Sequence, residues 1–217
     1  RVRRVDALVI THADADHTGG AAAVLERVRV GELVLPRVIA DRPELQPLRR
    51  IAERRGVAVR LAAAGDRFGW GELGCRVLWP PAAGGLADND LSLVAVLDSG
   101  GMRLLVTGDV EAGGEAAVVG SGADLRAEVL QLPHHGSRTS SRGVLLEAVR
   151  PRVAMAPTGT RPRFTYPDPQ VVARLRALPA LVVAQVWGVE RVWWDEGRVF
   201  VGTPVPDVVE SHGDIVR

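Results

Sequence analysis

The chain has 217 residues, 47% of them hydrophobic and 24% charged, and its 27 basic and 26 acidic residues leave a net charge of +1. This composition allows one globular domain with a sizeable core, and the near-neutral charge gives no electrostatic reason for a nucleic-acid or membrane-surface partner. The single cysteine, Cys75, excludes an internal disulfide and a thiolate metal cluster. No apolar run reaches the roughly 18 residues of a membrane helix, and no signal peptide is recognisable.

Strand-like and helix-like patterns alternate from the first residues onward. Val5–Thr11 is apolar and β-branched, which predicts a buried strand. Because the chain starts directly in this pattern, we expect it to be a fragment of a longer protein. Helices are expected at Gly19–Val30 and Pro43–Arg55. Further strands are expected at Leu33–Ile39, Val57–Leu61 and Cys75–Trp79, and a loop at Pro80–Asp90.

The alternation continues in the second half of the chain. The turn signal DSGG separates two strands of an expected hairpin, Leu91–Leu97 and Met102–Thr107. Expected helices follow at Glu111–Val119, Gly143–Val149 and Pro169–Leu178, and expected strands at Ala127–Leu132, Val153–Ala156, Val182–Trp187, Arg191–Trp194 and Arg198–Val201. This order predicts a layered α/β architecture, in which polar loops at strand ends form the site.

The first such loop, THADADHTGG, places His12, Asp14, Asp16 and His17 within six positions directly after a buried strand. Imidazole and carboxylate groups without sulfur suit zinc, manganese or iron. Alternate residues of an extended loop point the same way, so His12 and Asp14 can share one cation and the turn can aim the other pair at a second. A solvated loop with an N-cap aspartate is the alternative.

Two further loops follow apolar strands. LLVTGDVE delivers the Asp109 carboxylate to the rim of the sheet, although a strand that ends in Gly-Asp is by itself a common turn. LQLPHHGSRTSS adds His134 and His135, so four of the five histidines lie in two strand-end loops. The alternative for this pair is a surface position at the start of a helix. Together the three loops predict a metal centre.

These segments, in this order, resemble the metallo-β-lactamase superfamily and, more narrowly, the C-terminal domain of the ComEC-type competence proteins, the channel proteins of natural DNA uptake. NDLSLV at Asn89–Val94 also matches, and RPRFTYPDPQVVARL at Arg161–Leu175 matches more loosely. The resemblance implies an α/β (α+β) fold, an αββα sandwich over residues 1–203 whose opening strands are missing at the N-terminus. Residues 204–217 are expected to be a disordered tail.

The resemblance also implies one or two divalent ions, Mn²⁺ or Zn²⁺, and no nucleotide cofactor. The implied ligands are His12, Asp14, Asp16, His17, Asp109 and His135. In this assignment His12 and Asp14 hold one ion, Asp16 and His17 hold the other, and Asp109 bridges the two ions. The implied catalytic residues are Asp16, which also orients the nucleophile, and His134, which assists proton transfer; the reverse roles of His134 and His135 stay open.

The sequence departs from the superfamily pattern at two positions. Asn89 falls where the middle histidine ligand is expected, and Tyr166 stands where many relatives have a histidine before proline. Each change removes a histidine that could have served as a metal ligand. Residues near the later motifs are expected to bind substrate, arginines above all, because their guanidinium groups suit phosphate oxygens. The expected substrate-binding residues are Asn89, Ser137, Arg138 and Arg163.

The resemblance implies a metal-dependent phosphodiesterase or nuclease that hydrolyses DNA, single-stranded or the strand that is not imported. The partners would be DNA and the parent membrane channel, with this soluble domain on the extracytoplasmic, periplasmic side of an inner-membrane protein. One alternative is an inactive module of the same fold that binds DNA or scaffolds the channel, because the ligand set is thinned. A second alternative is a small-molecule metallohydrolase of the lactonase type, because a fold alone does not choose a substrate.

Overall fold

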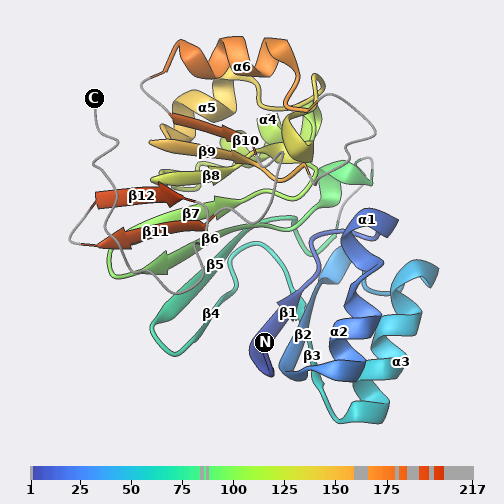
Figure 1. Cartoon of the computed structure of the whole chain (residues 1–217). Helices are drawn as coiled ribbons and strands as arrows, with labels where there is room; N and C mark the ends of the chain where they lie inside the picture. The colour runs from blue at the N-terminus through green and yellow to red at the C-terminus, as the bar shows by residue number, and fades with distance from the viewer. Residues whose placement is uncertain are drawn as a thin grey trace.

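The computed structural model describes residues 2–83, 86, 88–158 and 166–178, together with the backbone of three later strands. Two β-sheets form the centre of the molecule, and helices lie on the outer side of each (Figure 1). Arg163 and the tail expected at 204–217 lie outside the described residues, so both expectations stay predictions. In the described part, no helix has the length and apolar character needed to cross a membrane.

The first part of the chain forms a small parallel sheet with helices on one side (Figure 1). Its strands are β1 (Arg4–Val9), β2 (Arg29–Pro36) and β3 (Ala58–Ala62), in the order β1-β2-β3. Its helices are α1 (Ala15–Thr18), α2 (Ala21–Arg27) and α3 (Gln46–Arg55), with 3₁₀ turns η1 (Arg37–Ile39) and η2 (Pro43–Leu45). Because β1 is an edge strand of this sheet, the chain that leaves its end is free to turn toward the second sheet.

The second sheet is larger and mixed. Its strands are β4 (Arg67–Trp70), β5 (Leu73–Trp79), β6 (Val94–Ser99), β7 (Met102–Val106), β8 (Val129–Gln131), β9 (Val153–Ala156) and β10 (Leu181–Ala184), in the order β10-β9-β8-β7-β6-β5-β4. Neighbours from β4 to β7 are antiparallel and those from β7 to β10 are parallel. The remaining elements are η3 (Asn89–Leu91), α4 (Ala112–Gly120), η4 (Pro133–Gly136), α5 (Gly143–Val149), α6 (Pro169–Arg176) and the hairpin β11 (Arg191–Asp195)–β12 (Arg198–Gly202).

Three hydrophobic clusters hold the layers together. One packs α2 and α3 against the parallel sheet, with Leu25, Leu33 and Leu35 fully buried. The largest lies between the mixed sheet and the helices α4, α5 and α6. The third joins the two sheets and contains both Val34 of β2 and Val77 of β5. Helix, sheet, sheet and helix layers follow one another, so the expected αββα sandwich is confirmed.

Several element boundaries differ from the sequence prediction. The helix expected at Gly19–Val30 ends at Arg27, because Val28 turns to extended backbone (φ −114°, ψ 145°) and starts the path into β2. The strand expected from Leu91 begins at Val94, because η3 precedes it. The sequence did not predict β4, a four-residue strand. Its Trp70 donates from Nε1 to Glu32 of β2 over 2.7 Å, so a contact between sheets anchors it.

Candidate metal centre

The loop after β7 carries Asp109 at the rim of the mixed sheet. Gln131 of β8 holds this loop through its Oε1 atom, which accepts the N–H groups of Thr107 over 2.9 Å and Gly108 over 3.2 Å. Gly108 has φ +55°, and a Cβ atom there would lie 2.8 Å from the Cβ atom of Ser92. Ser92 Oγ accepts the Asp109 N–H over 3.1 Å. The backbone therefore fixes a carboxylate that is only 3% exposed.

The end of β1 brings His12 and His17 to this carboxylate. Thr11 Oγ1 lies 3.0 Å from His12 Nδ1 and 3.3 Å from His17 Nδ1, so one hydroxyl orients both rings. Their Nε2 atoms face Asp109, with His12 at 3.9 Å from Oδ2 and His17 at 3.2 Å from Oδ1. His12 is 1% exposed. His12 and His17 thus lie next to the buried Asp109 carboxylate, although the two motifs are far apart in the sequence.

The η4 turn supplies His134 and His135 from the other side. Both residues have left-handed backbone (φ 48° and 55°), and so does Gly136 (φ 82°). His134 Nδ1 donates to Glu111 Oε1 over 3.0 Å, whereas His135 Nδ1 donates to the Pro157 carbonyl over 2.8 Å. Their Nε2 atoms lie 3.8 and 3.6 Å from Asp109 Oδ2. The left-handed turn is what lets two consecutive side chains point to the same place.

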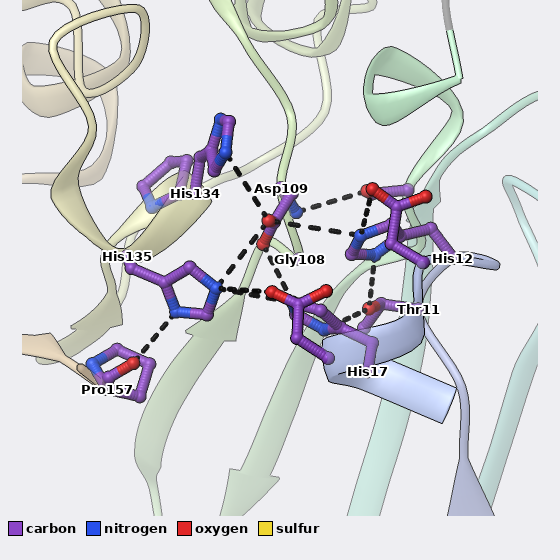
Figure 2. Close-up of polar contacts among 12 residues, drawn as sticks. Thr11, His12, His17, Gly108, Asp109, His134, His135 and Pro157 are labelled. Carbon is purple, nitrogen blue, oxygen red and sulfur yellow. Dashed lines mark hydrogen bonds and ion pairs between the residues drawn. The ribbon is translucent and has the colours of Figure 1, made fainter. Parts of the chain in front are cut away.

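All four imidazoles therefore present Nε2 to one buried carboxylate (Figure 2). One group of donors has its ligand atoms within 4.8 Å of one another: Asp16, His17, Asp109 and His135. On the other side of Asp109, His12 Nε2 lies 3.8 Å from Asp14 Oδ2. The side chains of Asp14 and Asp16 are 54% and 65% exposed, so they lie toward solvent while Asp109 closes the buried side.

Three observations fit a cation at this place. His12 Nε2 and Asp109 Oδ1 are buried without a hydrogen-bond partner, and buried polar atoms are normally satisfied. A carbonyl only accepts, so His135 carries its hydrogen on Nδ1 and turns an Nε2 lone pair inward. His135 Nε2 lies 3.4 Å from His17 Nε2, a separation that fits an N–H···N hydrogen bond or a cation shared by the two nitrogens.

Burial and charge shift the pKa values of the buried groups in different directions. Burial, with help from the neighbouring His17, lowers the pKa of His12. Burial alone would also lower the pKa of His17, but the carboxylates of Asp109, Asp16 and Asp14 together outweigh burial and raise it. Burial would raise the pKa of Asp109, yet His17, His135 and His12 together lower it. The carboxylate is thus held ionised among nitrogen donors, as a bridging ligand requires.

The other predicted residues occupy varied positions. Asn89 lies in η3, and its side chain makes no hydrogen bond with another described residue. Ser137 is 7% exposed, and its Oγ lies 3.0 Å from Thr139 Oγ1. Arg138 is exposed on the same loop. The Tyr166 ring stacks at 18° on His135, with their centroids 6.4 Å apart. Substrate roles for Asn89, Ser137 and Arg138 stay predictions.

Sequence reasoning missed four residues that hold the cluster in place. They are Thr11, Ser92, Glu111 and Gln131. All four lie in or next to the motifs, but Thr, Ser, Glu and Gln are common in loops. In the sequence, only their position in or next to the motifs could have indicated that these four residues support the cluster.

Comparison with known proteins agrees with this architecture. Residues 1–160 match the family model described as the metallo-beta-lactamase superfamily. The chain belongs to that superfamily. Among relatives of this metallo-β-lactamase domain, competence protein ComA of Neisseria gonorrhoeae is 38% identical over 178 residues, which cover 81% of this chain and 23% of the relative. ComE operon protein 3 of Bacillus subtilis is 33% identical over 175 residues, which cover 81% of this chain and 23% of the relative. The narrower resemblance to competence proteins is thereby confirmed.

The fold also has solved counterparts. Igni18, described as a novel metallo hydrolase from Ignicoccus hospitalis, superposes with a TM-score of 0.56 at 19% identity, covering 93% of this chain and 81% of that one. At this identity the likeness concerns the fold alone. Because this domain spans 23% of the two competence proteins, most of each relative has no counterpart in it.

Proposed function

We propose that this domain is a metal-dependent phosphodiesterase that hydrolyses DNA as part of a competence protein. The observation that carries the proposal is the convergence of four imidazole Nε2 atoms on the buried Asp109 carboxylate, with two buried polar atoms left without a hydrogen-bond partner. The relatives named for competence support DNA as the substrate. DNA and a parent membrane channel would be the partners, with the domain on the extracytoplasmic side.

Two cation positions share Asp109 in this proposal. Asp16, His17 and His135 would complete one of them. His12 and Asp14 would complete the other. The donors are nitrogen and oxygen atoms only, which suits Mn²⁺ or Zn²⁺. When bound, such cations lower the pKa of water and stabilise the charge that develops on phosphate oxygens.

The residues around the centre divide the remaining tasks. Asp16 is exposed at the solvent side, where its carboxylate can orient an attacking water and accept its proton. His134 is fixed at Nδ1 by Glu111, so its Nε2 atom can take up a proton from solvent and pass it to the leaving oxygen. Arg138 is exposed on the same loop and is suited to hold the phosphate backbone. In this proposal Asn89, Ser137 and Arg163 contribute further substrate contacts.

Hydrolysis of plasmid and single-stranded DNA with Mn²⁺, Zn²⁺ or a chelator tests the proposal. We expect cleavage with metal by the wild type and by Asp98→Ala, a control at an exposed position of β6. Asp16→Ala should lose cleavage but keep DNA binding. Equal cleavage by Asp16→Ala and wild type would refute the proposed role.

The same experiment separates the two alternatives. The wild-type domain would be a binding module if it bound DNA without cleaving it and held well under one equivalent of metal. Asn89 keeps this alternative in the test, because it stands where the middle histidine ligand is expected and its side chain makes no hydrogen bond with another described residue. Hydrolysis of a lactone without cleavage of DNA would instead identify a small-molecule hydrolase.

A further inference from the structure

Glu111 lies beside the metal centre, at the residue that precedes α4 and two positions after Asp109. Its backbone N–H donates to Asp90 Oδ1 over 2.8 Å, and its carbonyl accepts the N–H of Glu115 over 2.8 Å. The backbone is thereby held on both sides. The Glu111 side chain therefore extends from a backbone that these two hydrogen bonds hold in place.

The N-terminus of α4 makes no use of the Glu111 side chain as a cap. The carboxylate of Asp90, rather than that of Glu111, lies at the N-terminus of α4. A Cβ atom at Gly113 would be 2.6 Å from one Asp90 carboxylate oxygen, and a Cβ atom at Gly114 would be 2.8 Å from the other. An acidic group is favourable at a helix N-terminus. Asp90 therefore stabilises the helix, and the Glu111 carboxylate is left for other partners.

Those partners lie on the loop that carries the second pair of histidines. Glu111 Oε1 accepts hydrogen bonds from His134 Nδ1 and from Thr139 Oγ1, each over 3.0 Å. An ionised carboxylate only accepts, so the His134 hydrogen is on Nδ1. His134 Nε2 then turns its lone pair toward Asp109, whose Oδ2 lies 3.8 Å away.

His134 also needs support because of its backbone. A left-handed conformation is unfavourable for a non-glycine residue, and His134 and His135 adopt it in succession. His134 N–H donates to the Gly108 carbonyl over 3.1 Å, and Glu111 holds the ring of the same residue. The Glu111 contact therefore offsets local strain while it orients the imidazole.

We propose that Glu111 is a positioning residue that keeps His134 in the Nδ1–H tautomer with Nε2 facing Asp109. Its catalytic consequence rests on the proposed function, in which His134 Nε2 takes up a proton from solvent and passes it to the leaving oxygen. The tautomer itself does not rest on that function. Carboxylates that hold a site histidine in this way change affinity or activity about 10–100-fold when they are removed. Glu111→Ala should therefore release the ring, and Glu111→Gln should retain part of the control because its amide oxygen still accepts from Nδ1.

Nitrogen NMR of the imidazoles, measured in the presence of a chelator, tests the tautomer directly. The His134 signals are identified by their loss in His134→Gln. We expect the Nδ1–H tautomer in the wild type, in Glu111→Gln and in the control Glu26→Gln, which alters an exposed residue of α2. Glu111→Ala should change His134 to the Nε2–H tautomer. An unchanged tautomer in Glu111→Ala would overturn the proposal.

DNA hydrolysis supplies the second readout. We expect kcat of Glu111→Ala to fall about 10–100-fold with KM changed less than about twofold, and Glu111→Gln to lie between it and the wild type. Wild-type kcat in Glu111→Ala, or equal impairment of both variants, would overturn the positioning role. If Glu111→Ala does not fold, the test uses Glu111→Gln alone. A kcat of Glu111→Gln equal to that of the wild type would then contradict the positioning role of Glu111. Absence of cleavage in every protein refutes the nuclease, and the tautomer still decides the role of Glu111.

Discussion

Gly108 fixes the loop that carries Asp109 in the candidate metal centre, and a series of glycine-to-alanine substitutions tests why a glycine is needed there. Gly108 combines φ +55° with close neighbours: an added Cβ would lie 2.8 Å from Ser92 Cβ and 2.9 Å from Thr11 Cβ. Neither atom is the far end of a flexible side chain, so the loops themselves must move. Gly108→Ala therefore adds steric overlap to conformational strain.

Two other glycines separate these effects. Gly56, after α3, has φ +65° but no atom within 4 Å of an added Cβ, so Gly56→Ala should cost only the conformational part, about 1–2 kcal/mol. Gly120 closes α4 and also has open space around it, so Gly120→Ala should stabilise by about 0.5–1 kcal/mol. Gly108→Ala should cost about 2–5 kcal/mol, the sum of strain and overpacking.

Thermal and urea unfolding with a chelator present give the measurement. For a domain of this length, 1 kcal/mol corresponds to about 2–4 °C in Tm, so Gly108→Ala should melt roughly 4–20 °C below the wild type. It should also bind Mn²⁺ more weakly than Gly56→Ala, because Thr11 and Ser92 hold the rings and the Asp109 backbone. Equal destabilisation in Gly108→Ala and Gly56→Ala would refute the steric argument.

Three further predictions concern single contacts. Ser92→Ala removes the acceptor of the buried Asp109 N–H and should cost about 1–3 kcal/mol in urea unfolding; an unchanged midpoint would contradict this. Mn²⁺ or Zn²⁺ at about 100 times its Kd should stabilise the wild type by about 2.7 kcal/mol, and Asp109→Asn should show no such rise in Tm. Burial raises the pKa of Glu115 from 4.5 to about 7, although the N–H groups of Ser141 and Arg142 oppose this. The folded state then binds the proton more tightly, so the wild type should lose stability relative to Glu115→Gln as pH rises from about 4.5 through about 7, by on the order of 3 kcal/mol. A pH-independent difference between the two proteins would show that the shift is absent.

The layers and the position of the site were predictable because they depend on local patterns. Alternating strand-like and helix-like runs predicted a layered α/β architecture, and the family resemblance implied the αββα sandwich. Motifs at the ends of β1 and β7 predicted that their side chains meet. The missed strand β4 shows the limit of this reasoning. It has four residues, and Glu32 of the other sheet anchors its Trp70. A contact between residues so far apart leaves no periodic signal in the sequence.

The roles within the cluster were less predictable than its members. His12 and His17 share one hydroxyl, Thr11 Oγ1, a contact that requires the chain to turn through α1. Asp14 and Asp16 are both acidic and both belong to the motif, yet one lies near His12 and the other near His135. Residue type predicted the candidate ligand atoms, whereas the tertiary fold decides which of them lie close enough to share a cation.

His134 and His135 show most clearly why roles need the structure. Consecutive side chains diverge in a strand or a right-handed helix, and only their left-handed turn aims both at Asp109. That turn packs against Pro167, which lies 2.7 Å from a Cβ placed on Gly136. One ring is then bound by a carboxylate 23 residues away and the other by a carbonyl 22 residues away. Two identical residues thus acquire different chemistry from their partners, and that difference is what substitutions at Glu111 measure.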